Sequence, residues 1–234
     1  MGTGERGAGS GSSRRTWKFP LAQVALVAAG LIPLAVLVWD GLHDNLSANP
    51  IEKITHRTGL WTLGLLLGAL AITPLRRLTG INELIRFRRT LGLLAFSYVC
   101  LHFLTYIVLD QFFDWSAIVE DIAKRPYILA GFTSFLLLLP LAVTSTKGWI
   151  RRLGGRKWNA LHRLIYVAGA GGTLHFLWLV KGEQVKPVYF GLVLVALLGL
   201  RVLFARGAGD SGRGRARAVN FRPQPPLSVP LTDR

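Results

Sequence analysis

The sequence contains one cysteine and few acidic residues. Cys100 is the only cysteine among 234 residues, so the chain has neither an internal disulfide nor a Cys-x-x-Cys metal site, and it cannot attach a c-type haem covalently. Twelve acidic side chains stand against 28 Lys and Arg, which gives a formal net charge of +16. In a soluble protein this excess would suggest nucleic-acid binding. The basic residues lie between apolar runs and in the tails, however, so we expect no nucleic-acid partner.

Long apolar runs dominate the rest of the chain. Hydrophobic residues make up 51% of the sequence, and the mean hydropathy is +0.40. A bilayer core requires about 20 predominantly apolar residues per helix. Six segments come close to that length, namely 19–39, 54–73, 91–109, 127–143, 161–180 and 185–204. Because lipid offers no partner for free backbone groups, the sequence predicts an all-α integral membrane protein, a six-transmembrane-helix bundle.

The segments outside these runs define the expected domain organisation. Residues 1–18 are rich in Gly, Ser and Arg, a composition that cannot bury enough apolar area to fold alone. We therefore expect a disordered basic N-terminal tail over 1–18, one transmembrane domain over 19–204 and a disordered C-terminal tail over 205–234.

The basic residues also predict the orientation of the chain. Five Lys and Arg follow the second apolar run and five follow the fourth, against two in each intervening connection. Loops rich in Lys and Arg remain in the cytoplasm. The alternation predicts that both termini are cytoplasmic, in a multi-pass protein of the bacterial inner membrane. This topology explains the basic composition without a polyanionic partner.

Three histidines, His102, His162 and His175, lie within or beside the apolar runs. Ionisable groups are costly in lipid and usually face the bundle interior for a functional reason. Neutral imidazole is a good axial ligand for haem iron. At about 1.5 Å per residue, His102 lies roughly 17 Å beyond Leu91 and His175 roughly 21 Å beyond Leu161. The sequence therefore predicts that His102 and His175 bind one b-type haem iron in the outer half of the membrane, while His162 lies near the cytoplasmic face.

Small and aromatic residues near these histidines favour a flat macrocycle between the helices. Gly171 and Gly172 lie one turn before His175, and we expect them to leave room for a porphyrin edge, although close helix packing explains glycines equally well. Tyr98, Tyr106 and Trp178 are also one turn from the expected ligands. Their rings can pack on the macrocycle, and their polar tips can bond to its propionates.

Several short motifs occur in an order that resembles a known family. They include Asn49-Pro50, Thr55-His56-Arg57-Thr58-Gly59, Thr73-Pro74-Leu75-Arg76, Arg88-Arg89, Leu101-His102, Arg125-Pro126-Tyr127, Thr144-Ser145-Thr146 and Leu161-His162. The ordered set, over residues 20–204, closely resembles the MsrQ (YedZ) family. These are the haem-binding membrane subunits of bacterial periplasmic methionine sulfoxide reductase systems, within the ferric-reductase-like transmembrane superfamily.

The resemblance implies a role in electron transfer. Electrons would pass from a cytoplasmic flavin reductase or the quinone pool, through flavin mononucleotide (FMN) and haem b, to a periplasmic MsrP-type molybdopterin reductase that repairs oxidised methionine in proteins. The resemblance also matches His102, His162 and His175 to histidines of the family. FMN rests wholly on the resemblance, with Arg77, Arg88 and Arg89 as candidate phosphate ligands.

The sequence allows alternatives for the role of His162 and for the function of the three histidines. The larger superfamily carries a histidine pair on each of two helices, whereas here only the fifth run has one, so His162 could serve a second haem, orient a flavin or be structural. The histidines could instead relay protons in a small proton-coupled transporter. No Asp or Glu lies in the middle of a run, and no inverted repeat is evident, which favours the haem interpretation. A purely structural anchor would leave the histidines unexplained.

Overall fold

The computed structural model describes residues 18–179 and 185–220, and every regular element in these ranges is helical. The elements are α1 (Lys18–Leu42), α2 (Pro50–Thr79), the 3-10 turn η1 (Asn82–Leu84), α3 (Ile85–Thr105), the π-helical turn η2 (Tyr106–Asp110), α4 (Trp115–Lys124), α5 (Pro126–Val143), α6 (Lys147–Leu161), α7 (Leu164–Leu179) and α8 (Val185–Asn220). The expected all-α class is confirmed.

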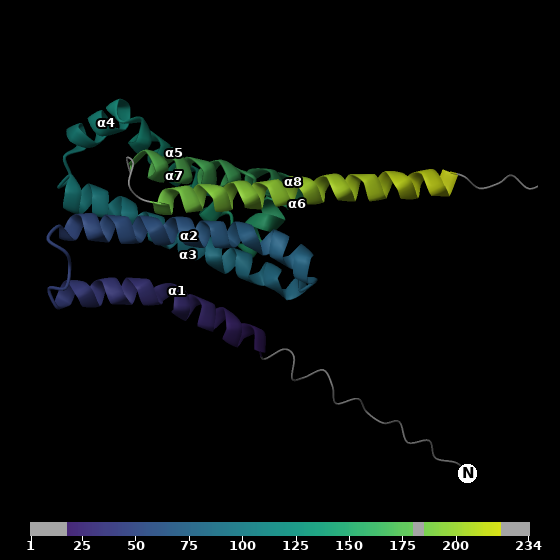
Figure 1. Ribbon diagram of the computed structural model, residues 1–234, viewed down its shortest axis with the longest axis horizontal. Helices are drawn as coiled ribbons and strands as arrows, with labels where there is room; N and C mark the ends of the chain where they lie inside the picture. Colours follow the sequence, from purple (N-terminus) through teal and green to yellow (C-terminus); the bar gives the residue numbers. More distant parts are fainter. Residues whose placement is uncertain (1–17, 180–184, 221–234) are drawn as a thin grey trace, which may run out of the picture.

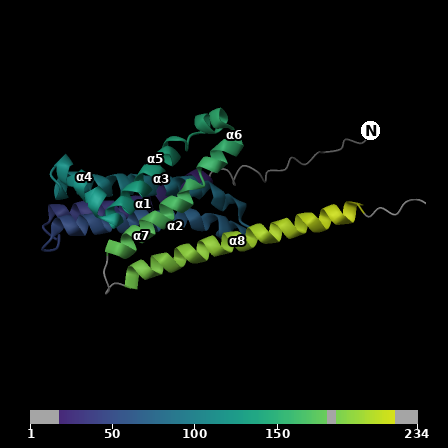
Figure 2. The same cartoon turned by 90° about the horizontal axis from the view of Figure 1, so that it is seen from above.

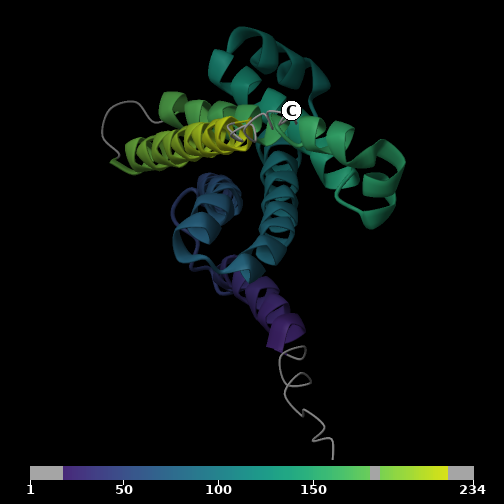
Figure 3. The ribbon, with the colours of Figure 1, turned by 90° about the vertical axis from the view of Figure 1, so that its right-hand side faces the viewer.

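The long helices lie side by side and give the molecule two distinct ends (Figure 1). At one end, here called the α4 end, are the α1–α2 connection and helix α4. At the other, the α6 end, are the α2–α3 connection, helix α6 and the far part of α8 (Figure 2). Seen end-on, α1 lies at one side of the bundle, where it mainly contacts α2 and α3 (Figure 3). The chain thus has a packed centre formed by α2, α3, α5 and α7, with α1 and α8 at its edges.

Within residues 18–179 and 185–220, five helical segments are long and apolar enough to cross a membrane: Leu21–Leu42, Pro50–Thr79, Asn82–Asp110, Pro126–Val143 and Val185–Arg206. The expected fifth run, 161–180, is the exception. There α6 ends at Leu161, His162 and Arg163 form a turn, and α7 begins only at Leu164. The 16 residues of α7 span about 24 Å, less than the about 30 Å of a bilayer core.

Two helices occur where the sequence predicted only connections. The side chain of Asp114 caps α4, and that of Thr146 caps α6, each by accepting a backbone N–H three residues on. Such caps satisfy free donors at a helix start. Before α4, Phe112 and Phe113 have φ of 47° and 63°, a left-handed conformation that is costly for bulky residues. The connection from α3 to α4 is therefore a strained turn.

The tails differ in part from expectation. Helix α8 continues through Asn220, so the first part of the segment 205–234, which we expected to be a disordered tail, is helical. A run with mixed polar composition can continue an established helix because each added residue completes one more backbone hydrogen bond. The expected disorder of 1–17 and 221–234 lies outside the described residues.

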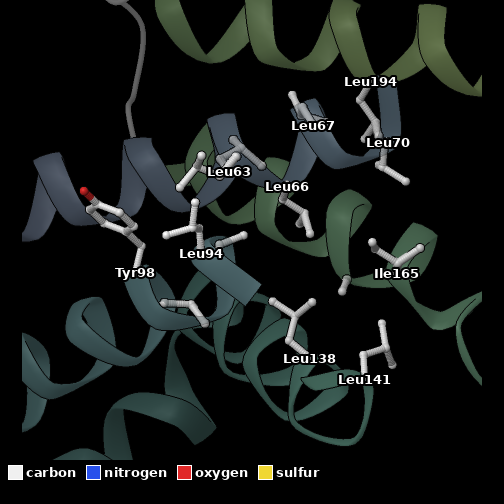
Figure 4. Close-up of a cluster of buried hydrophobic side chains, with 14 residues drawn as sticks. Leu63, Leu66, Leu67, Leu70, Leu94, Tyr98, Leu138, Leu141, Ile165 and Leu194 are labelled. Atoms are coloured by element: carbon white, nitrogen blue, oxygen red, sulfur yellow. The ribbon is translucent and has the colours of Figure 1, made fainter. Parts of the chain in front are cut away.

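Leucines of α2 form the middle of the core (Figure 4). Leu63, Leu66, Leu67 and Leu70 follow the i, i+3, i+4, i+7 spacing of one helical face, and all four are buried. Apart from Leu65, also on α2, the other buried members of the cluster come from α3, α5, α7 and α8 and include Leu94, Tyr98, Leu138, Leu141, Ile165 and Leu194. This cluster holds the four central helices together at mid-height and fixes how their ends meet.

Helix α2 has well-defined ends, and this positions one wall of the site. The Asn49 side chain accepts the Glu52 N–H and donates to the Glu52 carboxylate, while Pro50 occupies the first turn. Gly80, with φ of 73°, ends the helix by donating its N–H to the Arg76 carbonyl. The first turns of α2 are therefore held at the α4 end.

Candidate functional site

His102 and His175 come together at the α4 end of the bundle. His102 lies in the last turn of α3 and His175 in the last full turn of α7. Their ring centroids are 6.2 Å apart, and the ring planes make an angle of 77°. The structure thus brings together the two histidines that the sequence predicted would share one metal ion.

Each imidazole is anchored through Nδ1 to the main chain of a different helix. His102 Nδ1 lies 3.0 Å from the Thr55 carbonyl oxygen and 3.4 Å from the Thr58 hydroxyl. His175 Nδ1 lies 2.7 Å from the Tyr127 carbonyl oxygen. A carbonyl only accepts hydrogen bonds, so Nδ1 of each ring carries the proton and Nε2 keeps its lone pair. This is the arrangement of metal-binding histidines, whose second nitrogen is oriented by a carbonyl or carboxylate.

Two glycines allow α2 and α5 to approach these rings. An ideal Cβ on Gly59 would lie 3.1 Å from Cε1 of His102, and one on Gly131 would lie 2.9 Å from Nδ1 of His175. Contacts below about 3 Å are sterically forbidden to real side chains. Gly59 belongs to the motif Thr55-His56-Arg57-Thr58-Gly59, whereas no sequence pattern distinguishes Gly131 from the other glycines.

A cavity of about 600 Å³ contains both histidines. This lies within the roughly 300–1,000 Å³ typical of small-molecule and cofactor sites. Most of its lining is apolar and aromatic, including Leu63, Leu66, Phe103, Phe132, Phe135 and Leu138. The cavity can therefore hold a large, flat, mostly apolar group away from water.

Polar lining residues gather at the α4 end of the cavity. Tyr106 donates its hydroxyl to Asp121 at 3.2 Å, and Arg125 pairs with the same carboxylate at 3.1 Å. Arg125 also donates to the Tyr127 hydroxyl at 3.4 Å. This bond and the Asp121 charge raise the pKa of Arg125 above its ordinary value. The network links η2, α4 and the start of α5 beside the anchor of His175.

The donor set fits haem iron better than a metal held by protein alone. Two metal–nitrogen bonds of about 2 Å, one on each side of a shared ion, would separate the imidazole centroids by about 6 Å. The observed 6.2 Å agrees with this spacing. No group of three or more His, Cys, Asp and Glu side chains suited to a metal occurs among the described residues. Two protein ligands suffice when a porphyrin supplies the other four nitrogens.

Curated relatives cover most of this chain. The heme-binding subunit MsrQ of the protein-methionine-sulfoxide reductase of Herminiimonas arsenicoxydans is 50% identical over 187 residues, which are 79% of this chain and 86% of that protein. The MsrQ of Rhodospirillum rubrum is 50% identical over 196 residues, 82% of this chain and 93% of that one. The MsrQ of Ralstonia nicotianae is 49% identical over 202 residues, 86% and 93%. The chain belongs to the MsrQ family.

A broader family model agrees with this membership. The ferric reductase like transmembrane component matches residues 57–173. The match includes His102 and His162 and ends two residues before His175. The resemblance drawn from the ordered motifs is therefore confirmed, and this chain is a multi-pass membrane protein.

His162 lies apart from the other two predicted histidines. It follows α6 directly, stacks on Trp158 with ring centroids 3.8 Å apart, and its Nδ1 lies 3.1 Å from the Trp158 carbonyl oxygen. The expectation that His162 and His175 occupy one helix is wrong, because the chain turns at residues 162 and 163. His162 belongs to the α6 end.

The predicted arginines are also at the α6 end. Arg77, in the last turn of α2, lies over the Phe204 ring at 5.5 Å. Arg88 and Arg89 lie near the start of α3, with Arg88 partly buried and Arg89 exposed. Arg201, inside the last apolar run, was not predicted as a site residue. An arginine within a membrane span is itself a sequence signal for function.

The residues expected to surround a macrocycle divide into two groups. Gly172 and Tyr106 line the cavity. Tyr98 instead turns towards α1, where its hydroxyl donates to the Gly30 carbonyl at 2.7 Å. A Cβ on Gly171 would clash with the Ser134 hydroxyl, so this glycine serves close packing of α7 on α5. Trp178 is 48% exposed and does not line the cavity.

Proposed function

We propose that this chain is the haem b electron-transfer subunit of a protein-methionine-sulfoxide reductase system, in which His102 and His175 would hold the haem iron. The meeting of these imidazoles at 6.2 Å carries the proposal. Its relatives from Herminiimonas arsenicoxydans and Rhodospirillum rubrum are heme-binding subunits by name, which supports the proposal. A bound haem supplies one-electron redox chemistry.

The chain's own residues orient the ligands and exclude water. The Thr55 and Tyr127 carbonyls hold Nδ1–H of each ring, which fixes the tautomer and makes Nε2 a stronger ligand. Phe103 and Phe132 line the cavity and keep its dielectric low. At the rim, Arg125 is placed to bond an anionic edge group such as a propionate.

The proposed topology puts this site in the outer half of the membrane. Six spans, with the short α7 as the fifth, place both termini in the cytoplasm. Arginines are concentrated at the α6 end, where they lie in the last turn of α2, at the start of α3 and in α6. Loops rich in Lys and Arg remain cytoplasmic. The α4 end, with the histidine pair, then faces the periplasm of a bacterium with the chain in its inner membrane.

This placement suits transfer to a periplasmic acceptor. We propose an MsrP-type molybdopterin reductase as that acceptor, and a cytoplasmic flavin reductase or the quinone pool as donor. FMN is proposed on family resemblance, with Arg77, Arg88 and Arg89 as candidate phosphate ligands, and His162 as a residue near that entry point. Seven acidic residues lie on described connections and helix ends at the α4 end, namely Asp40, Asp44, Glu52, Asp110, Asp114, Glu120 and Asp121, which favours a basic surface on the acceptor.

An absorption spectrum of the purified protein tests the cofactor. We expect a Soret band and b-type bands that sharpen on reduction. His102→Ala and His175→Ala should each abolish or strongly alter the bands, and His162→Ala should have a milder effect. His43→Ala is the matched control, because His43 is exposed and stacks on Trp39 away from the cavity. A colourless, well-folded preparation would instead favour the proton-relay transporter.

The electron-transfer role needs a second measurement. The chain is reconstituted in a vesicle membrane with an electron donor on its cytoplasmic side and an MsrP-type reductase on its periplasmic side, and reduction of a methionine-sulfoxide protein by that reductase is followed. We expect turnover with the unaltered chain and none with His102→Ala. Equal turnover with both chains would contradict the role.

A further inference from the structure

Helix α4 packs against the protein along one face and presents a polar face to its surroundings. Ile118 is buried and Ile122 lines the cavity, so these two side chains belong to the inner face. Ser116, Glu120 and Lys124 recur every four residues on another face, where they are exposed, and Glu120 pairs with Lys124. This polar face is suited to water.

A third group of side chains is both apolar and exposed. It consists of Phe112, Phe113, Trp115 and Val119, here called the outer apolar strip, and its members are 54–77% exposed. The ring centroids of Phe113 and Trp115 are 6.5 Å apart, so the turn and the helix form one patch. At about 100° per residue, Trp115 and Val119 lie between the inner face and the polar face of α4. Exposed apolar groups of this extent mark a contact site for a protein or a membrane.

The turn before α4 maintains its strained backbone without burying its side chains. Phe112 and Phe113 both have positive φ, a conformation that persists only where other interactions compensate its cost. A bond from the Phe113 N–H to the Ile107 carbonyl, at 2.9 Å, holds the turn. Both rings are nevertheless more than half exposed. The turn therefore directs two phenyl rings away from the protein, which indicates a contact outside the chain.

Both ends of α4 are tethered at one boundary of the membrane. The candidate span before it ends at Asp110 and the next begins at Pro126, so only residues 111–114 and Arg125 separate α4 from the two spans. Its ten residues cover about 15 Å, which is too short to cross a bilayer. Helix α4 lies next to α5, at the end of the bundle where α3 also ends (Figure 1).

We infer that the outer apolar strip inserts into the lipid interface, so that α4 lies along the membrane surface. The three faces of α4 then meet three different surroundings, namely the protein, the boundary of the acyl chains and water. Interfacial amphipathic helices are bound in this way, and Trp is enriched at this level of the bilayer. Leu104 of α3 and Leu129 of α5 are also exposed, so the strip continues the apolar surface of the neighbouring spans.

This anchoring would stabilise one wall of the cavity. Asp121 and Ile122 of α4 line the cavity, and α4 packs mainly on α5. Lipid contact on the outer apolar strip adds a second attachment that keeps these side chains in place. The inference rests on the exposure of the strip and on the ends of the two spans, so it does not depend on a bound haem.

Spin labels on the full-length protein test the position of α4 in nanodiscs of phosphatidylethanolamine and phosphatidylglycerol. Cys100 is the only cysteine, so Cys100→Ser provides the background for single labels in Val119→Cys and in Glu120→Cys. Val119 is 66% exposed and the Glu120 side chain 58%, so burial in the protein does not distinguish them. We expect the Val119 label to collide severalfold more often with oxygen, which concentrates in lipid, and the Glu120 label with a water-soluble nickel chelate. Water-like accessibility of both labels overturns the inference.

Addition of an MsrP-type reductase separates a lipid contact from a protein contact. If the strip binds that protein, the Val119 label collides with the nickel chelate in its absence and is shielded when it is added. This result overturns the inference. A Val119 label that is shielded from the chelate before the addition and unchanged after it supports the lipid contact.

A pair of uncharged variants tests whether the strip anchors α4. In the same nanodiscs, Val119→Gln should increase backbone hydrogen exchange over residues 115–124 severalfold, whereas Ser116→Gln, on the polar face, should leave it unchanged. Gln has a higher helix propensity than Val or Ser, so a weaker helix cannot explain faster exchange in Val119→Gln. Unchanged exchange in Val119→Gln, or an equal increase in both variants, overturns the anchoring role.

Discussion

An ideal Cβ on Gly131 would lie 2.9 Å from Nδ1 of His175, the atom that bonds the Tyr127 carbonyl. Gly131→Ala should therefore displace the imidazole or push α5 away from α7. Overpacking of this kind costs about 1–3 kcal/mol. We expect a shifted or weakened Soret band in a protein that still inserts and folds.

A matched glycine separates the steric effect from helix propensity. Gly64, also in a central helix, has no atom within 4 Å of an added Cβ, so Gly64→Ala should leave the spectrum unchanged and add about 1 kcal/mol of helix stability. Gly59→Ala, at 3.1 Å from His102, should resemble Gly131→Ala. Wild-type spectra for both crowded variants would show that the glycines do not set the ring positions.

The angle between the imidazole planes predicts a spectroscopic property. The rings of His102 and His175 make 77° with each other. Axial imidazoles in nearly perpendicular planes leave two iron d orbitals almost equal in energy, so a low-spin ferric haem between them should give a strongly anisotropic electron paramagnetic resonance signal. An ordinary rhombic signal, typical of parallel imidazole planes, would contradict this prediction and would mean that the two rings rotate when haem binds.

The Asp121 carboxylate of α4 joins the turn η2 and the residue before α5 at the cavity rim. Asp121→Asn should lose the ion pair with Arg125 and weaken the bond from Tyr106, and since Asp121 is only 15% exposed and Arg125 is 53% exposed, we expect a loss of about 1 kcal/mol. Thermal unfolding measures this change. Glu120→Gln is the control on the same helix, because its pair with Lys124 is exposed and should contribute little. Equal losses in both variants would show that the buried network has no special role.

One buried hydroxyl ties α1 to the bundle. Tyr98 is 2% exposed and donates to the Gly30 carbonyl at 2.7 Å. Tyr98→Phe should destabilise the attachment of α1 by about 1 kcal/mol, seen as faster cross-linking or proteolysis of α1. Tyr189→Phe is the matched control, since Tyr189 is 63% exposed on α8. If the two variants behave alike, α1 is held by apolar contacts alone.

The sequence-based predictions were most accurate for features that a single segment specifies by its own composition. Apolar length predicted the helices of the membrane domain, and the cost of imidazole in lipid singled out His102, His162 and His175 as candidate ligands, of which the structure brings His102 and His175 together. The predictions failed at residues 161–164, where an apolar run contains a turn that hydropathy does not reveal. They also missed α4 and α6, whose starts depend on single capping side chains, Asp114 and Thr146.

Composition and residue order alone thus predicted the membrane class, the family and the chemistry of the candidate ligands. The free energy of transfer into lipid is a property of each residue type, and the family motifs are short stretches of sequence, so none of these predictions requires the fold. Only the tertiary structure decided the 77° angle at which the ring of His102 meets that of His175, and the turn that separates His162 from α7. It also decided which carbonyls hold the rings: Thr55 is 47 residues from His102, and Tyr127 is 48 from His175. Distances of that kind arise from how four helices pack on the α2 leucines, and no local pattern encodes them.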